Sequence, residues 1–303
     1  MIYVVGSLNM DLTAVVPHPP KAGETLAAQS FMTTPGGKGA NQAAAAQRLG
    51  GRVAMIGKVG RDAFGAQLKE NLASYGVRTA CVTEAPSPTG LAMITVCRKN
   101  NRIVLYGGAN QALVSEDIDE GLKSAKAGDL LLVQLEVPLA AVEHALTVAN
   151  RKGMITILNP APAVPLSGAV LEKCELIVPN ETETQILTGI LPDCEVNLAL
   201  AVQKLQRLGA RNVIVTLGGK GSAVAVGKEI TLIPARKVKV VDTTAAGDTY
   251  LGALAVRLEA GDDLVTAANY ATLAAALKIT RRGATSAVPS KNEVEEAVRR
   301  GLL

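Results

Sequence analysis

Short runs of apolar residues recur along the chain, and each has about the length of a strand that is buried on both faces. They cover residues 2–5, 53–56, 130–135, 154–158, 176–178 and 213–217. Helical patterns lie between them at 40–49, 63–75, 139–151 and 198–208, and a glycine follows each last turn, as expected of a left-handed cap. Strands that alternate with helices predict a three-layer α/β/α sandwich with a mainly parallel central sheet.

Two regions break this alternation. Residues 12–31 are interrupted by prolines, and residues 90–106 predict two alternating strands joined by Lys99-Asn100-Asn101. We expect these regions, with outer bounds near 12–34 and 90–108, to form a small antiparallel sheet that covers one end of the main sheet as a lid. Residues 247–281 are rich in alanine and predict helix that ends at Gly283.

Composition excludes several classes of protein. With 48% hydrophobic and 19% charged residues, the 303-residue chain is globular rather than disordered. Aromatic residues make up only 2% and the net charge is +4 without a basic run, so we expect no nucleic-acid partner. Only two histidines are present, and the four cysteines are far apart, which disfavours zinc hydrolases, Ser-His-Asp enzymes and disulfides. The sequence contains no basic n-region and no long apolar run, which predicts a cytoplasmic protein that has no membrane partner.

A glycine-rich segment, residues 35–42, runs directly into the first alanine-rich helix. It lacks the Walker A spacing, because Met32 and Gly39 occupy positions that this motif reserves for Gly and Ser or Thr, and it lacks the GxGxxG fingerprint. Its backbone permits close approach, and Lys38 and Asn41 can donate hydrogen bonds, which suits a polyhydroxylated ligand. The alternative is an ordinary turn before a helix.

Polar side chains follow several of the predicted strands. Asn9 and Asp11 come after the first strand and are two residues apart, so in extended backbone they point the same way. Glu136 follows residues 130–135, and Asn180 and Glu183 follow residues 176–178. The carboxyl edge of a parallel sheet is where ligands bind, and Asn180 and Glu183 could together orient a hydrated Mg²⁺. The alternatives are an Asx turn at Asn9 and an N-cap at Asn180.

A second glycine-rich turn, Thr216-Leu217-Gly218-Gly219-Lys220-Gly221, follows another predicted strand. Its glycines permit a tight turn whose amides can meet phosphate oxygens. A simple hairpin turn is the alternative.

The segment from 241 to 249 carries the most chemical information. Small residues lead into a helix, so the amides of Ala245, Ala246 and Gly247 converge at its positive end, with Asp248 in the first turn. Such amides can neutralise a phosphoryl group in transfer, and the carboxylate can take a proton from an attacking hydroxyl. An acidic residue that only complements the helix dipole is the alternative.

These segments together resemble the ribokinase branch of the PfkB carbohydrate-kinase family. The similarity is carried by residues 6–11, 36–42, 134–136, 158–163, 180–183 and 242–248. The resemblance implies one PfkB-type kinase domain over residues 1–303, with a ribokinase-like sandwich and a β-sheet lid. It also implies Mg·ATP-dependent phosphorylation of the 5-hydroxyl of D-ribose, and a homodimer joined through the lid strands.

The resemblance assigns roles to matching positions. Sugar contacts correspond to Asn9, Asp11, Gly37, Lys38, Asn41, Glu136 and Asp248, and Asp248 is also the catalytic base. The nucleotide side corresponds to Asn180, Thr216, Gly218, Gly219, Gly221, Gly247 and Thr272, and Glu183 is linked through water to Mg²⁺. An activating K⁺ corresponds to Asp242, Thr244, Lys278, Arg281, Gly283 and Ala287, mostly through backbone carbonyls. Ala287 departs from the pattern, because ribokinases often carry Ser there.

Two other functions stay open at this point. The first is a related kinase that acts on deoxyribose, another pentose or hexose, or a nucleoside such as adenosine. The second is a sugar or nucleotide sensor without catalytic activity. A sensor would be free to lose Gly247 or Asp248, and the sequence retains both.

Overall fold

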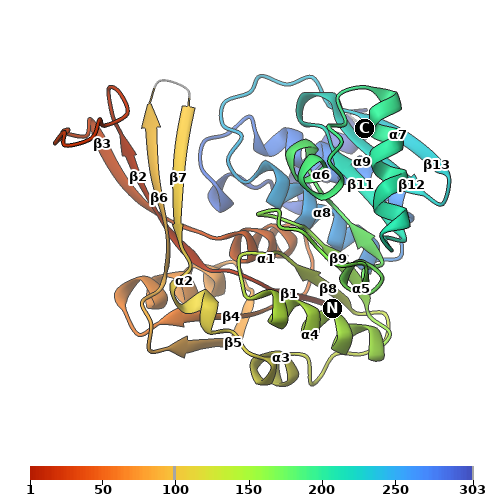
Figure 1. The fold of residues 1–303 in the computed structure, drawn as a ribbon, viewed down its shortest axis with the longest axis horizontal. Helices are drawn as coiled ribbons and strands as arrows, with labels where there is room; N and C mark the ends of the chain where they lie inside the picture. Colours follow the sequence, from red (N-terminus) through yellow and green to blue (C-terminus); the bar gives the residue numbers. More distant parts are fainter. Residues whose placement is uncertain (98–99, 302–303) are drawn as a thin grey trace.

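The computed structural model describes residues 1–97 and 100–301, which form one large and one small sheet (Figure 1). The large sheet has nine strands in the order β13-β12-β11-β10-β9-β8-β1-β4-β5. They are β1 Ile2–Val5, β4 Val53–Gly60, β5 Arg78–Ala85, β8 Leu130–Val133, β9 Ile155–Leu158, β10 Leu176–Ile177, β11 Asn212–Thr216, β12 Gly221–Val226 and β13 Glu229–Pro234. All pairings from β5 to β11 are parallel, and β12 and β13 add an antiparallel edge. The predicted mainly parallel sheet is confirmed.

Helices cover both faces of this sheet (Figure 1). They are α1 Lys38–Arg48, α2 Ala63–Ser74, α3 Ser115–Gly121, α4 Leu139–Arg151, α5 Gly168–Leu171, α6 Glu181–Thr188, α7 Glu195–Arg207, α8 Ala246–Glu259, α9 Leu264–Lys278 and α10 Lys291–Arg299. Alternate residues of β1 enter different cores: Ile2 and Val4 pack on the side of α1, α8 and α9, while Tyr3 and Val5 pack on the side of α3, α4 and α7. None of the described helices is both long and apolar enough to cross a bilayer.

The small sheet has the order β3-β2-β6-β7 and forms the lid. Its strands are β2 Asn9–Val15, β3 Ser30–Gly36, β6 Gly90–Cys97 and β7 Asn100–Tyr106. The outer pairings are antiparallel as predicted, but the central pairing of β2 with β6 is parallel, so the expectation of an antiparallel sheet is wrong there. Both β2 and β6 leave the body in the same direction and therefore run parallel to each other. The chain returns to the body through β3 and β7, respectively. Lys99, in the predicted connecting turn, lies outside the described residues.

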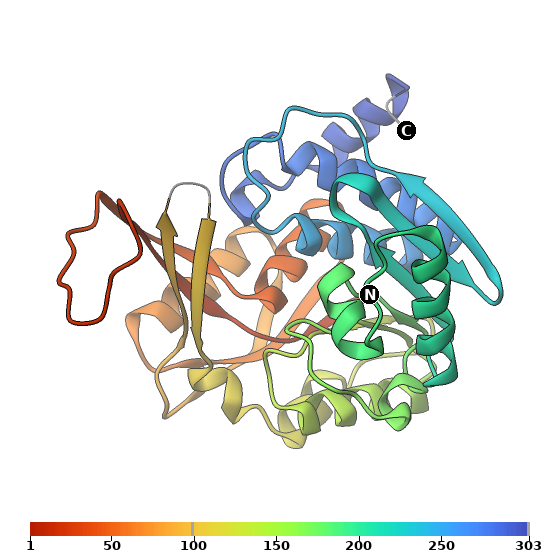
Figure 2. The same ribbon diagram turned by 45° about the horizontal axis from the view of Figure 1, so that its top comes forward.

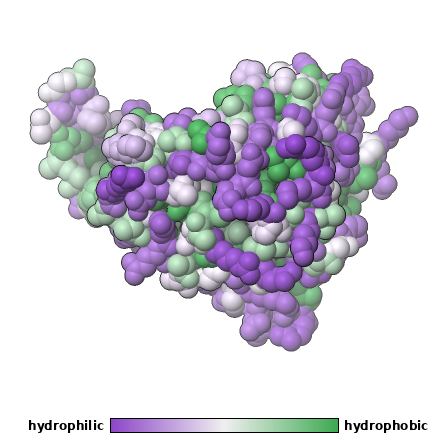
Figure 3. Space-filling model, turned by 90° about the horizontal axis from the view of Figure 1, so that it is seen from below, coloured by the Kyte–Doolittle hydropathy of each residue, from purple (hydrophilic) through white to green (hydrophobic). Residues whose placement is uncertain are grey.

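The lid projects from one end of the body (Figures 2 and 3). The connection between β2 and β3 forms its far end (Figure 2). β2 begins only four residues after β1 ends. Asn9 and Asp11 therefore lie at the base of the lid, on the strand that joins it to the main sheet. The predicted helix over 247–281 is divided into α8 and α9, because Asp263 caps a new helix by accepting hydrogen bonds from Val265 and Thr266 amides.

Candidate active site

Three adjoining cavities follow the carboxyl edge of the main sheet. The first, the lid cavity, has about 870 Å³ and lies between the lid and the loop before α8. The second, the central cavity, has about 230 Å³ and lies at the start of α8. The third, the outer cavity, has about 720 Å³ and lies between the turn after β11 and helices α8 and α9. Lys38, Glu183 and Asp248 line both the lid and central cavities, while Asn180, Thr216 and Gly247 line both the central and outer cavities.

The expected residues divide between the two large cavities. The seven positions expected to contact a sugar all line the lid cavity: Asn9, Asp11, Gly37, Lys38, Asn41, Glu136 and Asp248. The seven positions expected on the nucleotide side all line the outer cavity: Asn180, Thr216, Gly218, Gly219, Gly221, Gly247 and Thr272. Segments up to 263 residues apart in the sequence, Asn9 and Thr272, thus lie along one edge of the sheet, as the strand pattern predicts.

Asp248 lies in the first turn of α8 and is held by two side-chain amides from α1. Asn41 Nδ2 donates to its Oδ2 at 3.1 Å, and Gln42 Nε2 donates to its Oδ1 at 3.0 Å. Gln42 is fully buried and its own oxygen accepts a hydrogen bond of 2.6 Å from Gln134 Nε2, which fixes the orientation of the amide. Gln42 carries no role that its sequence motif alone would assign. The signal for it was a polar pair, Asn41 and Gln42, inside a buried alanine-rich helix.

The loop that enters α8 has an unusual backbone. Ala245 is the N-cap of the helix and adopts a left-handed conformation with φ 55° and ψ 21°, which costs an L-residue about 1 kcal/mol. Ala245, Ala246 and Gly247 all line the central cavity. The amide of Ala246 donates to the carbonyl of Thr243 at 3.1 Å, so it is already engaged. Local strain that turns amides into a cavity is typical of functional sites.

Glu136 is fixed at the opposite wall of the lid cavity. Its Oε2 accepts hydrogen bonds from Ser7 Oγ at 2.5 Å, Asn9 Nδ2 at 3.2 Å and the Lys38 amide at 3.2 Å. Asn9 is itself oriented by Asn110, whose Nδ2 donates to the Asn9 Oδ1 at 2.7 Å. Because these three donors all contact Oε2, the second oxygen of Glu136 is available for a ligand hydroxyl. Asn110 was not identified from the sequence, since it lies in a turn without a motif.

Asp11 shares the lid cavity with several other carboxylates, and two of them, Glu136 and Asp248, act on its pKa. Burial, together with the nearby charges of Glu136 and Asp248, raises the pKa of Asp11 from 3.8 to about 7. Gly36 leaves the space for its carboxylate, because a Cβ there would lie 2.4 Å from Oδ2. Asp11 is therefore an acceptor that lacks donors until a ligand supplies them.

Lys38 is the cation between the lid and central cavities. It is the first residue of α1, and burial acts to lower its pKa, but the carboxylates of Asp248, Glu136 and Glu183 outweigh burial and raise it. Lys38 is therefore positively charged where the two cavities meet. An anionic group that passes between the cavities meets this charge first.

Asn180 and Glu183 form the start of α6. The Asn180 side chain accepts from the Glu183 amide, and Glu183 Oε2 accepts from the Asn180 amide, both at 2.8 Å. This is the N-cap that the sequence left open as an alternative. Burial raises the pKa of Glu183, although the Asn180 amide and Lys38 act against it. The carboxylate is buried and lines the central cavity, and the nearby carboxylate of Asp248 also acts to raise its pKa.

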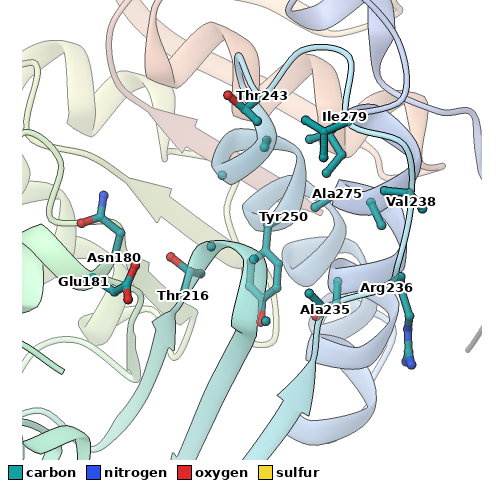
Figure 4. Close-up of a pocket in the computed structure, with 18 of the residues that line it drawn as sticks. Asn180, Glu181, Thr216, Ala235, Arg236, Val238, Thr243, Tyr250, Ala275 and Ile279 are labelled. Carbon is teal, nitrogen blue, oxygen red and sulfur yellow. The ribbon is translucent and has the colours of Figure 1, made fainter. Parts of the chain in front are cut away.

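The outer cavity is an open pocket between a turn and a helix pair (Figure 4). Asn180 and Thr216 lie on one side, and Val238, Ala275 and Ile279 lie on the other, with Tyr250 between them. The segment from Gly218 to Gly221 joins the antiparallel strands β11 and β12, so it is a hairpin turn, as the alternative interpretation of the sequence stated. The glycines of this turn also line the outer cavity. Apolar walls with a glycine-rich end suit a flat heterocycle joined to an anionic chain.

Of the residues expected around a monovalent cation, Thr244, Lys278 and Gly283 contact Asp242 in the loop before α8. Asp242 Oδ1 accepts from the Thr244 amide and Oδ2 from the Gly283 amide, both at 2.9 Å. Lys278 contributes its side chain, which the sequence analysis did not foresee: its Nζ donates to the main-chain oxygen of Asp242 at 3.0 Å. Arg281 pairs with Glu293 at 2.6 Å, and Ala287 is buried.

The fold and the three cavities together define a phosphotransferase that transfers a phosphoryl group from a nucleotide to a small polyhydroxylated acceptor. A model of pfkB family carbohydrate kinases matches residues 1–291. Ribokinase from Haemophilus influenzae is 39% identical over 295 residues, which cover 97% of this chain and 96% of that protein. The chain belongs to the pfkB family of carbohydrate kinases and is an ATP-dependent sugar kinase.

Two further relatives concern the identity of the sugar acceptor. Deoxyribokinase from Salmonella typhimurium is also 39% identical, over 298 residues that cover 97% of each protein. The solved structure of Arabidopsis thaliana ribokinase complexed with ribose and ATP is similar with a TM-score of 0.91 at 32% identity, and covers 98% of both chains. Overall similarity therefore does not separate ribose from deoxyribose as the acceptor.

Proposed function

We propose that the protein transfers the γ-phosphoryl group of ATP to the 5-hydroxyl of D-ribose. The observation that carries this proposal is the position of Asp248, which lines both the lid cavity and the central cavity beside the start of α8. Ribose in the lid cavity and ATP in the outer cavity would meet at this carboxylate. The chain acts in this proposal as one kinase domain over residues 1–303, whose lid lies over the sugar.

The residues present account for each part of the transfer. Asp248 is oriented by Asn41 and Gln42. It accepts the proton of the 5-hydroxyl of ribose while the oxygen of that hydroxyl forms a bond to the γ-phosphorus. The bond from that phosphorus to the bridging oxygen breaks, and the electron pair leaves with ADP. The start of α8 at Ala245 and Gly247, and the ammonium of Lys38, offset the negative charge that develops on the phosphoryl oxygens.

A divalent cation fits the central cavity through one carboxylate. Glu183 is buried there, and burial raises its pKa, so a bound cation would favour its charged form. We assign Glu183, with Asn180 beside it, to hold Mg²⁺ through water, as a cation with few direct protein ligands prefers. When bound, Mg²⁺ neutralises charge on the transferring phosphates.

The lid cavity favours ribose over 2-deoxyribose for a physical reason. Asp11, Glu136 and Asp248 are all acceptors, and burial together with the charges of the other two raises the pKa of Asp11, so hydroxyl donors would favour its ionised form. A sugar with more hydroxyl groups satisfies more of these oxygens. A site that is built to accept hydrogen bonds rejects an analogue that lacks a hydroxyl, because the buried acceptor stays unpaired.

A substrate panel tests the acceptor. We expect ribose to give the highest kcat/KM among ribose, 2-deoxyribose, fructose, tagatose and adenosine, with 2-deoxyribose lower by at least about tenfold. The measurement is steady-state ADP release from Mg·ATP at saturating nucleotide. A higher value for another compound would replace ribose in the proposal and retain the kinase chemistry. No turnover of any compound would favour a sensor.

We also propose that the protein is a homodimer joined through the lid. The face of the lid that does not line the lid cavity exposes Phe31, at 64%, and Val104, at 62%. Two such faces could cover each other, because apolar surface of this kind is stabilised by burial. The free cysteines at 81, 97, 174 and 194 agree with a reducing compartment, and we place the protein in the cytoplasm.

The dimer is tested by molar mass in solution. Light scattering after gel filtration should give twice the 31.3 kDa of the chain, and the double variant Phe31→Ser/Val104→Lys should give the mass of one chain. Val196→Lys is the matched control, because Val196 is 69% exposed on α7, away from the lid. A wild-type protein that elutes with the mass of one chain would refute this arrangement.

A further inference from the structure

Lys278 is a buried cation that the proposed reaction does not yet use. It is the last residue of α9, and its side chain is fully buried. A lysine at this end of a helix ordinarily reaches solvent or the last carbonyls of its own helix. Lys278 instead crosses to the loop before α8, where its Nζ donates to the main-chain oxygen of Asp242 at 3.0 Å. Buried lysines are rare unless they are paired.

Lys278 is buried beside two carboxylates. Burial lowers the pKa of Lys278, and the carboxylates of Asp242 and Asp248 oppose this lowering without cancelling it. Asp248 is the base of the proposed reaction. The ammonium group therefore acts on both the loop and Asp248 through a region with little solvent, where charges interact more strongly than in water.

The oxygens of Asp242, in the loop before α8, accept hydrogen bonds from donors of the protein itself. Both carboxylate oxygens of Asp242 accept main-chain amides, from Thr244 and Gly283, and its carbonyl accepts the ammonium of Lys278. The amides of Val241 and Asp242 donate to the carbonyl of Ile279 at 2.8 and 3.1 Å. Three oxygens of Asp242 are thus already engaged, and Ala287 has no hydroxyl to offer. This donor set fits a bound K⁺ poorly.

We propose that the Lys278 ammonium is a permanent internal cation of this loop and replaces the K⁺ that the resemblance implies. This inference rests on the proposed phosphoryl transfer. Lys278 is a positioning residue: it holds the Asp242 carbonyl, and thereby the loop up to Ala245, in the conformation that directs amides into the central cavity. Activity should consequently need no monovalent metal ion.

The first test uses the wild-type protein alone. We expect kcat/KM for ribose, or for the best acceptor of the panel, to agree within about twofold in KCl and in tetramethylammonium chloride at equal ionic strength. The melting temperature without substrates should also be the same in the two salts, and this measurement does not depend on the acceptor. Activation by K⁺ of more than about threefold would overturn the inference, even where ribose is confirmed as the acceptor.

Two variants of Lys278 separate charge from packing. Lys278→Met keeps a side chain of similar length without the charge, and we expect kcat to fall about 10- to 100-fold in both salts with little change in the KM for ATP. Lys278→Ala opens space for an ion, so K⁺ should raise both its melting temperature and its kcat above the values in tetramethylammonium. Wild-type kcat in Lys278→Met, or a Lys278→Ala variant that does not respond to K⁺, would overturn the inference.

Discussion

Replacing Asp248 by Asn is expected to lower kcat by about 10³- to 10⁴-fold, because general-base assistance and the charge that orients the hydroxyl are lost together. The KM for ribose should change by less than about tenfold, since Asp11, Asn41 and Glu136 still contact the sugar in the proposed complex. Steady-state kinetics with Mg·ATP measure both quantities. This is the largest effect that we expect from any single substitution.

Two controls accompany this measurement. Asp119→Asn removes one carboxylate from α3 without contacting any of the three cavities, and we expect wild-type kinetics from it. The melting temperature of Asp248→Asn shows whether the amides of Asn41 and Gln42 tolerate the change. A folded Asp248→Asn protein that keeps kcat within tenfold of the wild type would remove Asp248 from the role of base.

Replacing Asp11 by Asn should lower kcat/KM for ribose by about 100-fold, since hydrogen bonds to a charged acceptor contribute about 1.5 to 3 kcal/mol each. The same change should stabilise the protein without ligand. The pKa of Asp11 is about 7 against an ordinary 3.8, so its ionised form is disfavoured in the folded chain. Function and stability therefore respond in opposite directions at this residue.

The effects of Asp11 on stability and on the KM for ribose both depend on pH, each in a definite direction. Because the pKa is raised on folding, the stability contributed by Asp11 is fully present below pH 3.8 and is lost as pH rises to about 7. Asp11→Asn should thus melt at a higher temperature than the wild type at pH 8, and the difference should shrink toward pH 4. Ribose hydroxyls favour the ionised form, so the wild-type KM should rise as pH falls from 8 to 6. A KM that is constant over this range would contradict the role of Asp11.

Sequence patterns predicted most of the elements whose burial is extreme. The six apolar runs all became strands of the main sheet, since a strand buried on both faces has to be apolar throughout. They did not predict β5, where exposed and buried residues mix at the sheet edge, or β13, which is exposed at several positions. They also did not predict β12, although it is buried along most of its length. The direction of β2 relative to β6 depends on how both strands leave the body. Such pairing is a tertiary property that neither strand's own residues encode.

In the candidate site, too, the sequence located some residues and missed others whose role depends on tertiary contacts. Motifs placed Asn9, Asp11 and Asp248 at one edge, because strand ends and helix starts are visible in the sequence. They did not identify the support given by Gln42, whose amide is fixed by partners 92 and 117 residues away, Gln134 and Asn159. The buried position of Lys278 was likewise unpredictable, because a lysine in the last turn of a helix is usually explained by the helix dipole.

The shared walls of the three cavities have a consequence for inhibitor design. A single molecule that carries a pentose at one end and adenosine at the other, joined by a short chain of phosphates, could occupy all three cavities at once. Linking the two ends makes the second contact intramolecular, so the effective concentration of the tethered half can reach the millimolar range. The small volume of the central cavity, about 230 Å³, limits how many phosphates such a bridge can contain.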